Sequence, residues 1–303
     1  MASSRPETAL LAPTAGLRRR LTRIRRSRVL RRLLHHRMFV TGSALFLFVV
    51  LMAAFADALA PLPPDQIQFR HRFEPPSWAF PFGTDNFGRD LVSRMVYGAR
   101  LSLAIGFAVV ILNGIVGTAV GILAGYFRRL DNVLMRVMDA LMAFPAILLA
   151  VGIAAALGPS AINAVIALAA VYTPRTARIV RASVLVVREM EYVQAALACG
   201  AGHGRILFKH VLPNSLAPLI VQLTFIFAYA VLTEAILSFL GLGPEPPTPT
   251  WGNVIAEGRN YIREAPWITL FPGLAIAMTV LGLNLLGDGL RDALDPRMRV
   301  QQG

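Results

Sequence analysis

The sequence predicts an all-α membrane protein with six transmembrane helices and both termini in the cytoplasm. Three observations predict this fold class. Of the 303 residues, 55% are hydrophobic and only 16% are charged, which is too apolar for an ordinary soluble domain of this length. Uncharged runs long enough to cross a bilayer recur along the chain. The basic residues gather ahead of the first of these runs.

The distribution of charge decides what the excess of basic residues means. The net charge is +13, and such an excess is compatible with binding of nucleic acid or anionic lipid, or with orientation in a bilayer. Eleven of the 30 basic residues lie between Arg5 and Arg37, and the apolar runs that follow leave no soluble domain for a nucleic acid. The pattern indicates a cytoplasmic N-terminus by the positive-inside rule.

Five uncharged runs give the elements in order: 38–56, 101–127, 140–174, 211–233 and 265–287. Each is long enough, or nearly so, to cross about 30 Å of hydrocarbon. The third run is too long for one helix, and Gly158-Pro159-Ser160 divides it, because proline ends a helix and serine can cap the next one. Six spans result, and an even number places both termini on the same side.

This topology divides the chain into an arginine-rich tail (1–37), a first transmembrane helix (38–60), a periplasmic segment (61–98), a five-helix core (99–290) with a cytoplasmic loop (188–213), and a C-terminal tail (291–303). On this division 23 of the 30 basic residues are cytoplasmic. The external segments, about 58–98 and 242–265, are rich in proline and glycine and are predicted to be periplasmic loops with some local order. We expect no signal-peptide cleavage, because the first apolar run has the length of a span and more spans follow.

Arginines 175, 178 and 181 recur at every third residue and predict one basic helical face, for lipid head groups or for an acidic partner. The lone Cys199 is expected to be a small buried residue, since it has no partner for a disulfide. Asp85, Asn86 and Asp90 do not complete a calcium-ligand pattern, and the five histidines form no metal or catalytic constellation. We therefore expect no catalytic residues and no metal site.

The longest cytoplasmic loop is the part with enough sequence to form a structured surface. Glycines 200, 202 and 204 separate a short helical stretch, Glu189 to Cys199, from a second, Arg205 to Leu212, which Pro213 is expected to close. These features predict a helix-turn-helix outside the bilayer, slim enough at its turn to enter a groove of another protein.

The same loop resembles the "EAA" loop of ABC importer permeases. The family pattern is Glu-Ala-Ala, three residues, Gly, nine residues, an apolar residue, any residue and Leu-Pro. The chain matches it at Ala195, Ala196, Gly200, Leu212 and Pro213, and departs from it at Gln194 and His210. The resemblance implies that these residues, with Glu191, Tyr192 and Ala201, couple the chain to an ATPase. Gln194 lacks the charge of the family's glutamate, which puts a salt bridge from this position in doubt.

Further segments resemble the second permease subunit of the dipeptide, oligopeptide and nickel importers. They include Phe82 to Leu103, Thr233 to Gly243, Pro249 to Gly252 and Gly287 to Arg297. The resemblance implies a type I ABC importer permease fold in the bacterial inner membrane. It also implies a heterodimer with a homologous permease, two cytoplasmic ATPases that bind ATP and Mg, and a periplasmic or lipid-anchored binding protein. The chain itself contains no GxxxxGK[ST] motif, so we expect no bound cofactor.

Polar groups within the spans allow two interpretations. Glu234 is an acid well inside an apolar run, and it is either a structural hydrogen-bonding group or part of a gate or translocation path. Asn113, Asn163, Gln222 and Asn284 are expected to hydrogen-bond between helices. Glycines 114, 117, 121 and 125 predict close helix approach in the second span.

Two other classes of protein remain as alternatives: a self-sufficient secondary transporter or channel, and a membrane-anchored interaction protein. An ion-coupled carrier normally carries several intramembrane charges, whereas Glu234 is nearly alone here. The transport-subunit interpretation therefore fits better. The sequence leaves the substrate open among dipeptides, longer peptides, nickel chelates and other small solutes.

Overall fold

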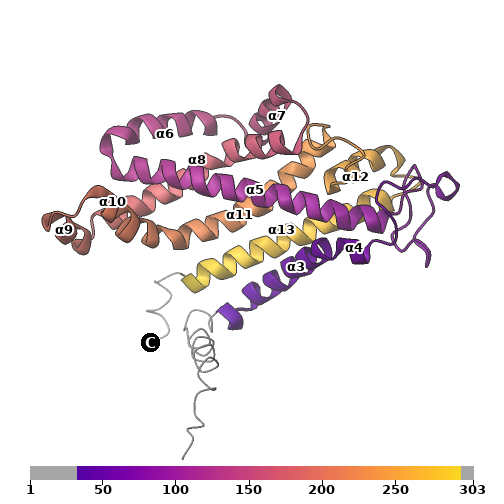
Figure 1. Ribbon diagram of the computed structural model, residues 1–303, viewed down its shortest axis with the longest axis horizontal. Coiled ribbons are helices and arrows are strands. Elements are labelled where there is room, and N and C mark those ends of the chain that lie inside the picture. The colour runs from indigo at the N-terminus through magenta and orange to yellow at the C-terminus, as the bar shows by residue number, and fades with distance from the viewer. Residues whose placement is uncertain (1–32, 295–303) are drawn as a thin grey trace, which may run out of the picture.

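The computed structural model describes residues 33–294, and within that range it consists of helices and loops with no strand (Figure 1). The predicted Arg-rich tail (1–37) and C-terminal tail (291–303) lie mostly outside the described residues. The α-helices are α3 (Arg37–Ala54), α4 (Ala56–Leu59), α5 (Leu91–Tyr126), α6 (Arg128–Met142), α7 (Ala146–Leu157), α8 (Ala161–Arg188), α9 (Glu191–Ala198), α10 (His203–Ile206), α11 (Leu212–Phe239), α12 (Trp251–Gly258) and α13 (Trp267–Leu294). Short 3₁₀ turns lie at Phe69–His71 (η1) and Arg259–Tyr261 (η3), and a π-helical turn at Leu207–Val211 (η2) joins α10 to α11.

Four helical segments in the described range are long and apolar enough to cross a membrane: α3, α5, the segment from α10 through α11, and α13. A fifth crossing results if α6 and α7, which are bent by 92° at their junction, form one broken span. Helix α8 is 28 residues long, but the arginines in its second half keep it out of this count. Several membrane crossings are thus confirmed, while the sixth and the side on which the termini lie stay predictions.

The predicted break at Gly158-Pro159-Ser160 is confirmed. Helix α7 ends at Leu157, Gly158 has a φ of +89°, and the Ser160 hydroxyl caps α8 by accepting a hydrogen bond from the amide of Ile162. The structure adds a second break before Pro145, where α6 ends and α7 begins. The expected uninterrupted helix from residue 140 was wrong, because proline disfavours a helical conformation in the residue before it.

Helix α5 begins earlier than the uncharged run at 101–127 predicted. It starts at Leu91, where the Asp90 carboxylate caps it by accepting from the amide of Ser93 at 2.7 Å. The run-based boundary was wrong because it excluded Arg94 and Arg100, both of which lie inside the helix. With 36 residues, α5 is about 54 Å long and reaches beyond the hydrocarbon at one end at least.

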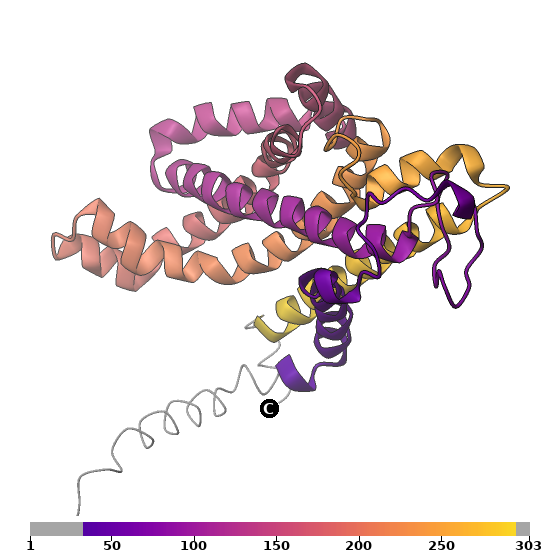
Figure 2. The ribbon, with the colours of Figure 1, turned by 45° about the vertical axis from the view of Figure 1, so that its right-hand side comes forward.

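The predicted close approach at the glycines of α5 is confirmed. A Cβ atom added at Gly117, Gly121 or Gly125 would lie 2.7 Å from a side-chain carbon of α8, on Thr176, Val180 and Val184 respectively. Helices α5 and α8 therefore pack backbone against side chain, which only small residues allow. In Figures 1 and 2 these two helices run side by side through the middle of the molecule.

Helix α3 also packs on α13 through glycines that allow a close approach of the two backbones. A Cβ atom at Gly42 would lie 2.5 Å from the amide nitrogen of Leu286, and one at Gly289 would lie 2.7 Å from the backbone of Phe39. Figure 1 shows α3 and α13 next to each other, at the opposite side of the bundle from α6. The first helix is thus joined to the core chiefly through the last one.

Candidate functional site

The cytoplasmic loop predicted at 188–213 forms a protruding helical hairpin in the described structure. Helices α9 and α10 lie beyond the ends of the neighbouring long helices (Figure 1). Between them the chain turns at Gly200, whose φ of +78° favours glycine. The amide of Ala201 closes the turn by donating to the carbonyl of Ala196 at 3.0 Å. The predicted helix-turn-helix is confirmed.

Buried side chains hold this hairpin in one orientation relative to the bundle. Val193 of α9, Ile206 of α10 and Val211 of η2 are all completely buried, and they share one apolar cluster with Val180 and Val184 of α8. The Gln194 amide donates to the carbonyl of Arg188 at 2.9 Å and caps the end of α8. A displacement of the hairpin must therefore move α8 and α11 with it.

The outer surface of the hairpin is free to meet another protein. Tyr192 and Phe208 have relative exposures of 43% and 75%. Around Gly200, Gly202 and Gly204 there is open space, because an added Cβ atom would find no atom within 4 Å. Glu191, Gln194 and Ala195 are also exposed, whereas Ala196, Ala201, His210 and Leu212 are partly buried. An exposed aromatic surface with a slim glycine turn is suited to docking in a groove.

Two details of the loop were predicted wrongly. Pro213 does not close a separate helix; it lies in the first turn of α11, and the π-turn η2 joins α10 to α11 without a gap. Proline is tolerated in a first turn because its missing N–H has no partner there. Cys199 is exposed rather than buried, because it follows α9 at the tip of the hairpin.

The basic face predicted from Arg175, Arg178 and Arg181 finds its acidic partner inside the chain. Arg181 binds Asp131 of α6 through two parallel contacts of 2.5 and 2.6 Å, and Arg178 binds Asp139 at 2.6 Å. The guanidinium of Arg175 lies 5.7 Å from the ring centre of Tyr229. These pairs fix α6 along α8, so the face is a helix contact rather than an open lipid site.

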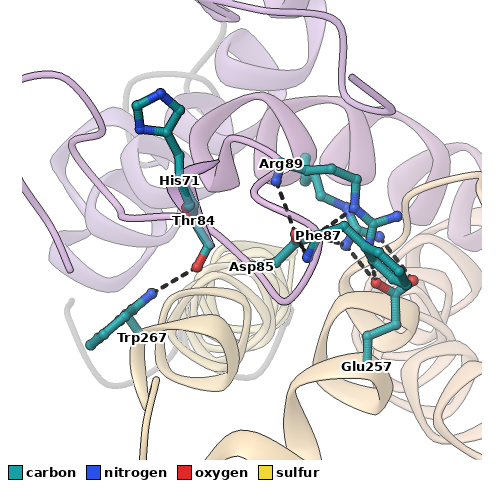
Figure 3. A network of polar contacts seen from close by, with 8 residues as sticks. His71, Thr84, Asp85, Phe87, Arg89, Glu257 and Trp267 are labelled. Atoms are coloured by element: carbon teal, nitrogen blue, oxygen red, sulfur yellow. Dashed lines mark hydrogen bonds and ion pairs between the residues drawn. The ribbon is translucent and has the colours of Figure 1, made fainter. Parts of the chain in front are cut away.

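A cluster of four charged side chains lies at the end of the molecule opposite the hairpin (Figures 1 and 3). Asp85 and Arg94 are fully buried, Arg89 is nearly so, and Glu257 of α12 closes the cluster. Arg94 lies 2.7 Å from Asp85 and 2.6 Å from Glu257, while Arg89 contacts both carboxylates. Two cations face two anions, so the segment that leads into α5 is joined to α12 without net charge.

The sequence did not predict this cluster, because one of its members, Glu257, lies far from the others along the chain. The available signal was the near equality of acidic and basic residues in the two external segments, which suits pairing between them. Asp85 is engaged by arginines and Asp90 by the cap of α5, and no metal-binding group of acids, histidines or cysteine occurs among residues 33–294. Trp267 adds a further tie by donating to the carbonyl of Thr84 at 3.0 Å (Figure 3).

Glu234 is completely buried and sits among hydroxyl groups. Ser238, one turn further along α11, donates to it at 2.7 Å, and Ser102 of α5 donates at 3.1 Å. The Ser102 hydroxyl also accepts from the amide of Trp251 at 3.4 Å, which brings α12 into the same network. The structure thus gives Glu234 a structural setting, and its role in a gate stays a prediction.

The polar amides within the spans divide into two groups. Asn113 accepts a hydrogen bond from Thr176 and joins α5 to α8, as expected, while Asn163 donates to the carbonyls of Leu157 and Gly158 and caps α7. Gln222 and Asn284 make no hydrogen bond to any residue in 33–294, so the expectation of interhelical bonds was wrong for them.

The long apolar helices, the internal ion clusters and the protruding hairpin are features of a multi-pass membrane protein with an exposed helical hairpin at one end. Comparison with known proteins agrees. Residues 117–300 match the model of the family described as "Binding-protein-dependent transport system inner membrane component", and residues 25–76 match the N-terminal transmembrane domain of oligopeptide transport permease C. The first match covers more than half of the chain, and the chain belongs to this family of ABC importer permeases.

Several curated relatives are similar over most of their length. The chain is 56% identical over 271 residues to a peptide transport system permease protein of Brucella abortus, covering 89% of this chain and 92% of the relative. It is 48% identical over 265 residues to a dipeptide transport system permease protein of Alkalihalophilus pseudofirmus, covering 87% of each. It is 39% identical over 293 residues to a glutathione transport system permease protein of Pectobacterium atrosepticum, covering 96% and 97%. These relatives are permease subunits and not enzymes.

Proposed function

We propose that this chain is one of two homologous permease subunits that form the pore of a bacterial inner-membrane importer for small peptides. The hairpin 188–213 carries the proposal, because it is exposed at its tip and rigidly packed at its base. Peptides are the preferred substrate class, since the relatives are named for peptide, dipeptide and glutathione transport. A nickel chelate is the alternative solute, and it has no comparable support here.

In this proposal the chain binds no nucleotide, and two cytoplasmic ATPase subunits hold ATP and Mg. Each permease would seat its hairpin in one ATPase. Because α9 packs against the end of α8 and α10 continues into α11, closure of the ATPase dimer would tilt both long helices. Tilting of packed helices is an established way to carry a small movement from one end of a bundle to the other.

A periplasmic or lipid-anchored binding protein would deliver the peptide at the other end. The surface for it would be the first external segment together with α12, which the cluster of Asp85, Arg89, Arg94 and Glu257 holds as one unit. This placement follows from six crossings, α3, α5, α6–α7, α8, α11 and α13, with the arginine-rich N-terminal tail in the cytoplasm.

The test uses the purified complex of permeases, ATPases and peptide-loaded binding protein. Gly202 is the better position for adding bulk, because it has a φ of −67° and open space around it. At Gly200 any side chain would also strain the turn. We expect Gly202→Leu to leave the complex folded while stimulated ATPase activity and uptake fall by about tenfold or more, the scale of a disrupted interface centre.

Gly152→Leu is the matched control, because Gly152 also has open space around it but lies in α7, far from the hairpin in sequence. Unchanged coupling in Gly202→Leu would contradict the proposal. So would peptide uptake by this chain without ATPase subunits, which would instead support a secondary transporter.

A further inference from the structure

A groove of about 530 Å³ lies between α8, α11 and α13 on the half of the bundle that carries the hairpin. One face of α11 supplies most of its wall, through Asn214, Ala217, Pro218, Val221, Gln222 and Phe225. Their spacing of three or four residues places them on a single side of the helix. Ile179 of α8 and the pair Arg291 and Leu294 of α13 complete the wall. The volume is that of a site for a small molecule, ~300–1,000 Å³.

Gln222 is the first sign that this groove receives a ligand. It lies inside a span, is only partly exposed, and has no hydrogen-bond partner in the described chain. An amide at membrane depth costs free energy unless its donors and acceptor are satisfied. Asn113 and Asn163, by contrast, are both hydrogen-bonded. Gln222 therefore needs a hydrogen-bond partner from outside the described chain, such as water, a polar ligand or another subunit.

Arg291 is the second sign, at the cytoplasmic end of the same groove. It is exposed and has no ion-pair or hydrogen-bond partner among residues 33–294, and none of the residues lining the groove is acidic. Arg291 is the one charged side chain among the residues that line the groove, and a guanidinium can bind a carboxylate through two parallel hydrogen bonds.

Asn214 links the groove to the hairpin. Its amide nitrogen donates to the hydroxyl of Tyr192 on α9 at 3.1 Å and to the carbonyl of His210 at 2.6 Å. The side-chain oxygen of Asn214 makes no hydrogen bond in the described chain and is available to accept from a ligand N–H. Asn214 alone thus separates a ligand in the groove from Tyr192, which belongs to the predicted docking surface.

We propose that the transported peptide occupies this groove as it leaves the pore for the cytoplasm. Arg291 binds the C-terminal carboxylate of the peptide and Gln222 binds its backbone. Val221 and Phe225 contact its side chains. This inference rests on the proposed function, because it takes the transported solute to be a peptide. An anionic lipid or a helix of the partner permease would be the other possible occupant, and the test separates both from the peptide.

The test is protection of a single cysteine in the assembled complex. Cys199→Ser removes the only native thiol of this chain, and Val221→Cys then places one in the groove. The complex is reconstituted in nanodiscs without nucleotide, and labelling is read on this chain alone after the subunits are separated. We expect alanyl-alanine to slow maleimide labelling of this cysteine several-fold. Arg291→Gln or Gln222→Leu in the same background should raise the half-protecting concentration by about tenfold, the effect of losing a charged or buried hydrogen bond.

Two controls match these variants. Asn284→Leu removes another unpartnered amide of a span outside the groove, and Arg136→Gln removes an exposed cation of α6. Both should leave protection unchanged. Alanyl-alanine amide lacks the carboxylate. In complexes that retain Arg291, its half-protecting concentration should be about tenfold higher than that of alanyl-alanine.

Three results would overturn the proposal. The first is a labelling rate that dipeptide does not change in a complex that still imports dipeptide, and this result would reject the subsite alone. A complex that imports no peptide would instead reject the proposed function itself. The second is protection by added anionic lipid but not by dipeptide. The third is a cysteine that reacts in the isolated chain but not in the complex, which would show that a partner subunit fills the groove.

Discussion

Arg94 donates two hydrogen bonds to Glu257, at 2.6 and 3.0 Å, although 163 residues separate them in the sequence. Arg94 lies in the first turn of α5 and Glu257 lies in α12, so this contact joins the two helices at the end of the molecule opposite the hairpin. The same guanidinium binds Asp85, which is fully buried.

Removal of Arg94 should therefore destabilise the molecule strongly. Arg94→Leu leaves Asp85 and Glu257 with Arg89 as their one remaining cation in the cluster. Breaking a buried pair in this way costs about 3–5 kcal/mol. We expect a clearly lower thermal unfolding midpoint in detergent, while Arg136→Leu on the exposed face of α6 changes it little. Equal midpoints for the two variants would contradict the structural role given to the cluster.

The pair of Asp131 and Arg181 should hold α6 against α8. Both side chains are partly exposed, at 20% and 33%, so Asp131→Asn is expected to cost only about 1 kcal/mol or less. Faster hydrogen exchange in α6, with α5 unaffected, is the expected measurement. The exchanged pair Asp131→Arg with Arg181→Asp should restore slow exchange, and failure of this rescue would argue against a direct contact.

Gly121 should not tolerate a larger residue. An added Cβ atom would lie 2.7 Å from the carbonyl oxygen of Ala177 and from Val180, and overpacking of this kind costs about 1–3 kcal/mol even for a single methyl group. Gly121→Leu should lower the yield of folded, monodisperse protein in size-exclusion chromatography. Gly152→Leu, in open space, should behave as wild type. Similar yields for both would show that α5 and α8 do not pack through this glycine.

Two substitutions of Glu234 distinguish a structural role of this residue from a gating role. Glu234→Gln keeps an acceptor oxygen for one of the two serine hydroxyls and turns an N–H toward the other, whose oxygen can accept it. A structural role therefore predicts nearly normal assembly and transport. Glu234→Leu leaves both buried hydroxyls without that acceptor, at about 1–3 kcal/mol each, and should impair assembly. Transport lost in an assembled Glu234→Gln complex would instead support a gate or translocation path.

The sequence predicted those features that depend on local patterns. The break at Gly158-Pro159-Ser160, the contacts of the α5 glycines and the turn at Gly200 each follow from residue types at a few neighbouring positions. The resemblance in the hairpin 188–213 identified the family, which the comparisons confirmed. These features need no knowledge of long-range contacts.

The features that the sequence could not predict depend on partners far away in the chain. Helix packing alone decides that Arg94 pairs with Glu257, that Arg181 pairs with Asp131, and that Gln222 finds no hydrogen-bond partner among residues 33–294. The start of α5 was missed for the same reason, because a charge count cannot tell that Arg94 is neutralised inside a helix. Charged residues near the end of a predicted span can therefore lie inside the helix, paired with other side chains, and need not lie in a loop.

The most direct test of the central claim uses Cys199, the only cysteine of the chain, which lies exposed beside Gly200 at the tip of the hairpin. A photoactivated cross-linker attached to this thiol in the assembled complex should give an adduct with an ATPase subunit, and nucleotide should change its yield. The Cys199→Ser variant should give none. An adduct confined to lipid or to the partner permease, with no ATPase product, would contradict the assignment of 188–213 as the docking element.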